Sequence, residues 1–452
     1  MSGQGVSLSC DPWVRRAVLA IVAGILVRLA LSPFLTYDLE IYHWGVVMEN
    51  IQSGNGLYGL AGYYYTPVWG YLLAALSGFQ DAFLSIGTFG IRFTDLLGIE
   101  DLVCRYHTAT AVTIGFVMAL KVPLILTDAA VGVLSFFFVR SISGDGRKAF
   151  FASVLWIFFP VAVYMSGVQV QFDSVSALLM LLTVFLVIRG HSLLGGAVFS
   201  AAVLLKFYPA VCLPVLVAYL FVRYRSDGRF GRELSKAVVG AGASAAVLLL
   251  PQILGGDLSD AFSFITGRVS DGDALMTVTS FLSMAAMLAG FVVCGYRMYR
   301  CGEDPEKALV VNCLLALSFA TVFSFVPQYI LVAVPFLCVA ATCFDGRYMA
   351  CWWMVGIGNL FAAVSINNFS LFASSSEFLG MASPEWVVSA MEAMESLTVA
   401  GFTSVEILDA AGCVFGAWGI ILILVIGLED VIPSERLRGR IGNLWRWECG
   451  QE

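Results

Sequence analysis

Long apolar runs separated by short polar segments repeat along almost the whole chain. A helix needs about 20 apolar residues to cross a bilayer, and the first run, residues 14–34, has that length. The pattern predicts an all-α polytopic membrane protein with about twelve transmembrane helices. The expected spans are residues 14–34, 118–140, 149–166, 174–189, 193–207, 210–224, 237–254, 278–297, 308–325, 329–344, 349–365 and 405–428.

The longest interruption between spans covers residues 35–107. Residues 41–51 and 66–79 within it are apolar enough to form amphipathic helices lying on the membrane. We therefore expect one integral membrane domain over residues 1–452. It would comprise a first span (1–34), a large loop (35–107), the remaining spans (108–428) and a tail (429–452).

Composition supports the membrane class and narrows the partners. The chain is 59% hydrophobic and 13% charged, against about 25% charged in soluble domains. Its net charge of −7 argues against a nucleic-acid partner, which would require a basic face. The eleven cysteines show no CxxC spacing and the three histidines are dispersed, so the sequence predicts no metal site built from these residues.

Most lysines and arginines fall in alternate connections, such as the segment 223–236. By the positive-inside rule these connections are cytoplasmic, as are both termini, and the loop 35–107 lies outside. The expected location is the cell membrane in a prokaryote and the endoplasmic reticulum in a eukaryote.

Asp38, Glu40 and His43 follow directly on the first span. Charged groups near hydrocarbon are costly, so such a cluster is a functional candidate, although it is equally typical of a polar loop that ends a helix. If this stretch is extended, residues i and i+2 point the same way and both carboxylates face one cavity. Tyr65 lies in an aromatic segment suited to stacking on a sugar, or simply to an interfacial belt.

Further polar residues interrupt or end the spans. Lys121 and Asp128 are seven residues apart and so lie on roughly one helix face, and Arg28 lies inside the first span. Lys206 closes another span; a lone lysine there usually snorkels, but several span ends carry hydrogen-bonding groups on the same side. The remaining candidates are Gln171, Asp173, Gln328 and Tyr329.

Carboxylates, a cation and aromatic rings beside a membrane suit a reaction on a lipid-linked anion. The phosphate of a polyprenyl-phosphate sugar would bind near Lys206 or Arg28, helped by Gln328 and Tyr329. Asp38, the first carboxylate beyond the span, is the candidate general base that would deprotonate an acceptor hydroxyl, with Glu40 and His43 beside it. The other candidates would line the cavity: His43, Tyr65, Lys121, Asp128, Gln171 and Asp173.

Several short motifs resemble those of the C-type (GT-C) integral membrane glycosyltransferases, which use polyprenyl- or dolichyl-phosphate sugars. The likeness covers roughly residues 15–340 and includes the dolichyl-phosphate-mannose-dependent mannosyltransferases of GPI-anchor synthesis and prokaryotic relatives. The motifs are Asp38-Leu39-Glu40, Gly54-Asn55-Gly56-Leu57-Tyr58, Tyr65-Thr66-Pro67, Lys121 to Asp128, Gln171-Phe172-Asp173, Lys206 with Pro209, and Val326-Pro327-Gln328-Tyr329.

The resemblance implies a GT-C-like fold and inverting transfer of a hexose, mannose first among them, to a lipid- or protein-linked acceptor, without a cofactor. Two departures matter. Glu40 stands where the family has aspartate, and no histidine precedes Gln328. Which carboxylate is the base stays open, as does a divalent ion held by Asp38 and Glu40.

Two other classes of function remain. A secondary transporter or lipid flippase would use Arg28, Lys121 and Asp128 in an ion or substrate path. Transporters commonly carry internal repeats, and none is evident in this sequence. A non-catalytic subunit of a glycosylation complex is the third reading.

Overall fold

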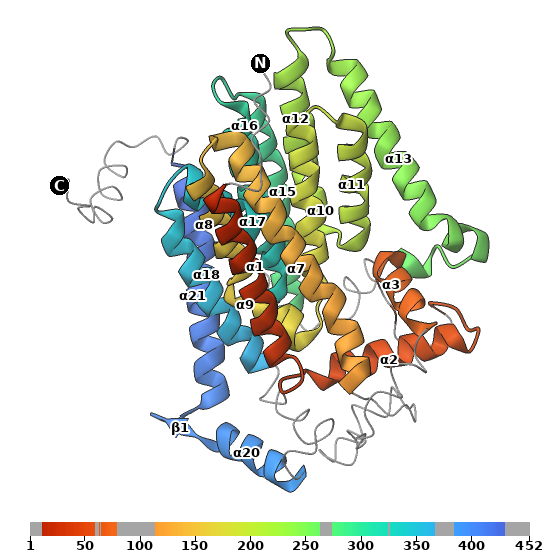
Figure 1. Ribbon diagram of the computed structural model, residues 1–452, viewed down its shortest axis with the longest axis vertical. Helices are drawn as coiled ribbons and strands as arrows, with labels where there is room; N and C mark the ends of the chain where they lie inside the picture. The colour runs from red at the N-terminus through yellow and green to blue at the C-terminus, as the bar shows by residue number, and fades with distance from the viewer. Residues whose placement is uncertain are drawn as a thin grey trace, which may run out of the picture.

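The computed structural model describes residues 11–58, 63, 65–78, 114–262, 274–323, 326–366 and 384–429. These residues form helices and one hairpin of two strands, each two residues long (Figure 1). The first part contains α1 (Pro12–Leu31), α2 (Asp38–Gln52), α3 (Pro67–Ser77), α7 (Ile114–Ser143), α8 (Gly146–Ile157), α9 (Pro160–Tyr164), η3 (Met165–Gln169), α10 (Asp173–Ile188), α11 (Ser192–Leu205), η4 (Tyr208–Cys212), α12 (Leu213–Tyr224) and α13 (Phe230–Gly255). The second contains η5 (Asp260–Phe262), α15 (Ala274–Tyr299), α16 (Pro305–Thr321), η6 (Pro327–Val332), α17 (Val334–Cys343), α18 (Tyr348–Ile366), α20 (Pro384–Ser396), β1 (Thr398–Val399), β2 (Phe402–Thr403) and α21 (Ser404–Gly427).

The described residues of each predicted apolar run are mostly helical, and the chain is an all-α, multi-pass membrane protein. Fewer of the described helices than the sequence predicted are long enough and apolar enough to cross a membrane. Among the described residues five helices can cross a membrane alone: α7, α13, α15, α18 and α21. Counting α8 with the Pro160–Gln169 segment as one span bent by 49° makes six. The count of about twelve is therefore not established.

Prolines explain why several expected spans are broken. Pro160 begins α9 immediately after the bend, and Pro209 and Pro327 lie in the 3₁₀ segments η4 and η6. Proline lacks the N–H that an α-helix interior requires, so it is best accommodated in the first turn of a new segment. The result is a set of short apolar helices, among them α10 and α11, whose ends carry polar residues.

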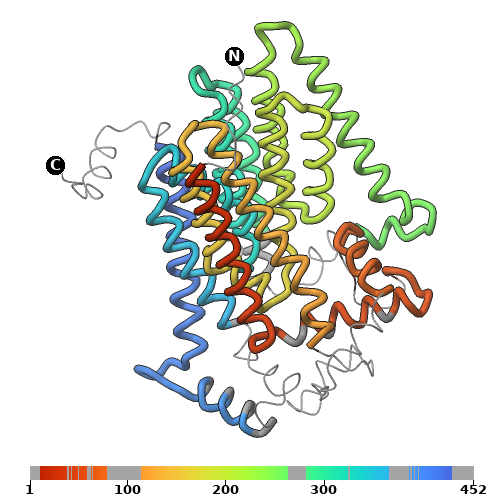
Figure 2. The backbone as a smooth tube through the Cα atoms, in the orientation of Figure 1, coloured from red at the N-terminus to blue at the C-terminus, as the bar shows by residue number. Residues whose placement is uncertain are grey.

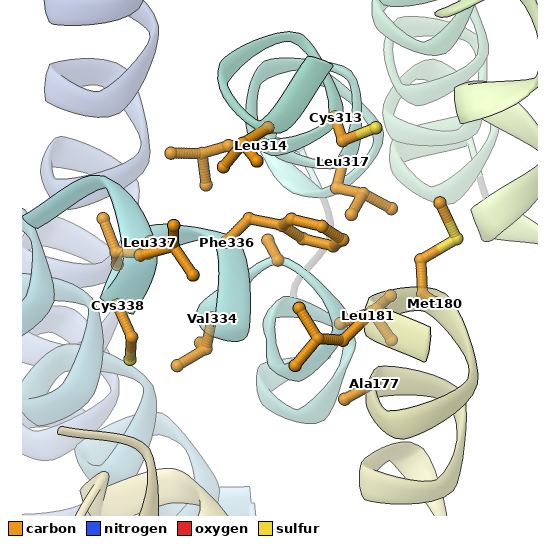
Figure 3. Close-up of a cluster of buried hydrophobic side chains, with 14 of the residues drawn as sticks. Ala177, Met180, Leu181, Cys313, Leu314, Leu317, Val334, Phe336, Leu337 and Cys338 are labelled. Atoms are coloured by element: carbon orange, nitrogen blue, oxygen red, sulfur yellow. The ribbon is translucent and has the colours of Figure 1, made fainter. Parts of the chain in front are cut away.

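The core lies between the central helices. Figure 3 shows Phe336 of α17 reaching between Leu317 of α16 and Leu181 of α10. All three side chains are at most 1% exposed. Burying a side chain of this size contributes about 1.5–3 kcal/mol, so this layer fixes α10 relative to α16 and α17.

Glycines let two helix pairs approach backbone to backbone. A Cβ on Gly358 of α18 would overlap the backbone of Gly416 in α21, and one on Gly240 of α13 would overlap the carbonyl of Leu193 in α11. Close approach through small residues is a common way for membrane helices to associate. Figure 1 shows both pairs running side by side.

The amphipathic helices expected within residues 35–107 are present as α2 and α3, and in Figure 2 α2 runs across the ends of the long helices. Ile41, Trp44 and Met48 recur at helical spacing and are fully buried. Residues 38–40 are not extended, as a shared direction for Asp38 and Glu40 would require; they form the first turn of α2. The loop beyond residue 78 and the tail 430–452 lie outside the described residues, as does His107.

Candidate active site

Glu40 and Gln171 are joined by a side-chain hydrogen bond. Gln171 Nε2 donates to Glu40 Oε1 at 2.6 Å, and links α2 to the turn before α10. Glu40 is only partly exposed. Desolvation raises the pKa of its carboxyl to about 7, although the nearby Lys206 charge acts in the opposite direction. A carboxylate with such a pKa suits proton transfer near neutral pH.

A strained turn places Gln171. Residues Met165–Gln169 form a π-helix, and Val170 has the left-handed conformation with φ 61°. π-Turns occur frequently at functional sites, and a left-handed β-branched residue is a genuine outlier that costs on the order of 1–3 kcal/mol. The Gln171 backbone N–H then closes the turn on the Met165 carbonyl at 3.0 Å. The strain thus coincides with the residue that contacts Glu40.

Asp173 and Lys206 form a buried ion pair beside this turn. Lys206 Nζ lies 3.3 Å from Asp173 Oδ2, and the two side chains are 6% and 0% exposed. Tyr208 donates its hydroxyl to the other carboxylate oxygen, Oδ1, at 3.0 Å. Lys206 ends α11 because Pro209 follows three residues later.

Aromatic rings surround the Lys206 ammonium. Nζ lies 4.4 Å from the ring centroid of Phe172, 5.2 Å from Tyr65 and 5.3 Å from Tyr329. Cation–π contacts of this length contribute about 0.5–2 kcal/mol each. Trp69 of α3 in turn stacks on Phe172, with ring centroids 4.9 Å apart. Lys206 is therefore enclosed by rings from three separate segments and does not snorkel.

His43 lies one turn beyond Glu40 on α2. Burial lowers the pKa of its imidazole to about 4, and its ring lies edge-on to Trp44 with centroids 4.6 Å apart. The imidazole is consequently neutral at pH 7. A neutral His43 adds no positive charge to the group of residues around Glu40.

Arg28 and Asp128 form a second buried pair, which holds α1, α7 and η3 together. Arg28 Nε donates to Asp128 Oδ2 at 2.9 Å and to Ser166 Oγ at 3.0 Å. Arg28 Nη1 donates to the carbonyl of Ile157 at 2.7 Å. Both charged side chains are 0% exposed. A role for Arg28 in binding phosphate stays a prediction, and the structure gives this arginine a helix-joining role.

Lys121 holds the end of α1. Its Nζ donates to the carbonyls of Ser32 and Leu35, each at 2.8 Å, and to the Thr36 hydroxyl at 2.9 Å. The seven-residue spacing to Asp128 indeed puts both side chains on the α1 side of α7. Cations favour helix C-termini because carbonyls are left unpaired there, so Lys121 stabilises the turn that leads into α2.

The structure brings together six residues that the sequence singled out: Glu40, Tyr65, Gln171, Asp173, Lys206 and Tyr329. Gln328 precedes Tyr329 in η6. The side chain of Asp38 lies outside the described residues. The predicted site residues did not include Phe172, Tyr208 or Trp69, although Phe172 lies within the motif Gln171-Phe172-Asp173 and Tyr208 lies two residues after Lys206.

Among the described residues, no group of three or more His, Cys, Asp or Glu side chains is arranged to hold a metal ion. No protein-family model matches the chain, and no curated protein matches it either. The case for a function consequently depends on the geometry around Glu40 and Lys206.

Proposed function

We propose that the protein is an inverting glycosyltransferase with a GT-C-like fold that moves a hexose from a polyprenyl-phosphate donor to a lipid- or protein-linked acceptor. The observation that carries the proposal is the Glu40–Gln171 contact beside the Asp173–Lys206 pair. At this place Glu40, whose pKa is about 7, lies near the buried Lys206 ammonium and its surrounding aromatic rings, at the ends of apolar helices.

In the proposed reaction Glu40 accepts the proton of the acceptor hydroxyl. The oxygen forms a bond to the anomeric carbon of the sugar, on the face opposite the phosphate. The bond from that carbon to the phosphate oxygen breaks, and polyprenyl phosphate leaves with the electron pair. General base catalysis of this kind typically contributes 10²–10⁴-fold.

Lys206 is the cation placed to stabilise the leaving phosphate. Asp173 is the one carboxylate within ion-pair distance of it among the described residues, and 3.3 Å is longer than an optimal charge-assisted contact. The ammonium has three donors, so it can bind a phosphate oxygen while remaining near Asp173. The surrounding rings exclude water, which strengthens that attraction.

We assign Glu40 as the base because Gln171 holds its carboxylate beside the Asp173–Lys206 pair. Protonation of Glu40 during the reaction leaves Lys206 and Asp173 as a neutral pair beside the departing anion. Asp38 remains the alternative base that the motif resemblance predicts, and its comparison with Glu40 requires variants.

The transporter or flippase alternative draws less support. Its three intramembrane charges, Arg28, Lys121 and Asp128, join α1 to α7 and η3 through the contacts described above. Charges that fix helices to each other are poorly suited to bind and release an ion.

The test is direct. Purified protein is incubated with a panel of radiolabelled polyprenyl-phosphate hexoses and membrane-lipid acceptors, and products are separated by extraction and chromatography. The proposal predicts a new glycosidic linkage of inverted anomeric configuration from one donor. Vesicle uptake or lipid scrambling with no glycosidic product from any donor would instead support the transporter class.

A further inference from the structure

A separate cavity of about 320 Å³ lies between α16, η6, α18 and α21, away from the Glu40 group. Its walls are mostly small or apolar, and Asp409, Asn359 and Cys413 are its polar lining residues. Its size lies at the lower end of the range for small-molecule sites, about 300–1,000 Å³. Segment η6 contributes to both places, because Pro327 lines the cavity and Tyr329 contacts Lys206.

The lining residues on α21 define the length of the cavity. They run from Asp409 to Ile420 along one helix, through Gly412 and Gly416. At 1.5 Å per residue this is about 16 Å, close to half of the about 30 Å hydrocarbon thickness. The cavity therefore runs along α21 for about the thickness of one leaflet, starting near the end of α21 that carries α20 and the β hairpin (Figure 1).

Asp409 is the charged residue of this cavity. It is exposed, it lies in the second turn of α21, and no cationic side chain pairs with it among the described residues. The neighbouring Glu406 is differently placed: its carboxylate accepts from the Thr403 N–H at 2.8 Å in a capping box. An acidic group at the mouth of an apolar cavity within a membrane helix is a functional candidate.

We infer that this cavity holds one hydrocarbon chain of a membrane lipid whose head group carries a protonated amine, and that Asp409 pairs with the amine. The apolar length of one leaflet matches a single chain, and the carboxylate at the mouth matches the ammonium at head-group level. This site does not depend on the glycosyltransferase proposal, because its lining residues differ from the described partners of Glu40 and Lys206.

The experiment uses the full chain in phosphatidylcholine nanodiscs containing a trace of photoactivatable phosphatidylethanolamine or phosphatidylcholine, each with a diazirine in one acyl chain. Crosslinked peptides are identified by mass spectrometry. We expect phosphatidylethanolamine to label α18 and α21 about fivefold more than phosphatidylcholine, as a solvent-accessible ion pair allows. Equal labelling by the two lipids in the wild-type protein would overturn the inference.

Asp409→Asn should abolish the preference while leaving residual labelling by both lipids. Glu406→Gln, which removes a charge one turn away but keeps the capping acceptor, should leave the preference intact. Ala417→Phe should reduce labelling by both lipids because it fills the cavity, whereas Val414→Phe on the exposed face of the same helix should not. A preference for phosphatidylethanolamine that survives Asp409→Asn would contradict the proposed lipid site. Unchanged labelling of a folded Ala417→Phe variant would contradict it as well. If Ala417→Phe does not fold, the result for Asp409→Asn alone tests the proposal.

Discussion

Gln171 Nε2 lies 2.6 Å from Glu40 Oε1, across 131 residues of sequence. The contact joins the first helix after α1 to a turn held in a left-handed conformation at Val170. Gln171 Oε1 is buried and has no hydrogen-bond donor in the described part of the chain. The amide therefore makes one described contact, and that contact orients the carboxylate proposed as the base.

Gln171→Ala should slow transfer by roughly 10- to 100-fold, because the Glu40 carboxylate loses the hydrogen bond that fixes its position, and small displacements of a catalytic group are costly. The rate of a single turnover at saturating donor measures this loss apart from binding. Gln169→Ala is the matched control, since Gln169 is similarly buried in the adjacent π-helix and no hydrogen bond to Glu40 is described for it. Equal losses in the two variants would mean that the turn, and not the Glu40 contact, is what matters.

Lys206→Ala should weaken donor binding, measured with a radiolabelled polyprenyl-phosphate sugar, because the phosphate loses its counter-charge. Lys206→Arg should retain more binding than Lys206→Ala, although its planar guanidinium fits the ring enclosure poorly. Removing the lysine also leaves Asp173 buried and unpaired, which destabilises the fold.

The double variant Lys206→Ala/Asp173→Asn separates these two effects. It should recover thermal stability without recovering donor binding. Recovery of both would show that Lys206 serves only to neutralise Asp173.

Transfer should depend on pH through Glu40. Its pKa is raised to about 7, so the protonated form, which cannot accept a proton, predominates below pH 7. The single-turnover rate should fall about tenfold per pH unit well below pH 7 and level off above it. Glu40→Gln should abolish this limb along with most of the activity. A limb near pH 4 in the wild-type protein would contradict the desolvated environment described for Glu40.

The ionisation of Glu40 should also affect folding stability, and in the opposite direction to its effect on the rate of transfer. The folded-state pKa of Glu40 lies above its ordinary value of 4.5, so the folded protein binds more protons than the unfolded chain between these values. The contribution of Glu40 to stability should therefore decrease as pH rises from about 4.5 to 7.

Asp128→Ala should lower the free energy of unfolding by about 3–5 kcal/mol, because it leaves Arg28 buried without its partner. Thermal unfolding in detergent measures the change. Asp227→Ala, which breaks an exposed pair with Arg229, is the control and should have little effect. The double variant Arg28→Met/Asp128→Leu should be more stable than Asp128→Ala, and failure of that recovery would contradict the pairing.

Local patterns predicted the helices well but not their long-range contacts. The spacing of apolar residues identified every described span-like helix, and the prolines at 160, 209 and 327 mark the breaks. The Arg28–Asp128 pair joins residues one hundred positions apart, and periodicity contains no information on such partners. Similarly, Val170 is an ordinary strand or helix former by propensity, so its left-handed conformation could not be read from sequence.

The sequence predicted which residues belong to the candidate site but not which of them contact each other. Grouping polar residues at span ends selected Glu40, Gln171, Asp173 and Lys206 correctly as neighbours. The apolar spacing from Ile41 onward predicted a helix over residues 41–51, and the structure begins this helix three residues earlier, at Asp38. The rings enclosing Lys206 come from three segments, and only the tertiary fold assembles them.

The most direct test of the central claim is single-turnover transfer of a radiolabelled hexose from its polyprenyl phosphate, at saturating donor, in four proteins. These are wild type, Glu40→Gln, Asp38→Asn and Glu392→Gln, the last altering an exposed carboxylate on α20. The account predicts a loss of roughly 10²–10⁴-fold for Glu40→Gln with donor binding intact, a smaller loss for Asp38→Asn, and none for Glu392→Gln. A larger loss for Asp38→Asn than for Glu40→Gln would transfer the role of base to Asp38, and wild-type rates in both variants and in their double would contradict the enzyme assignment.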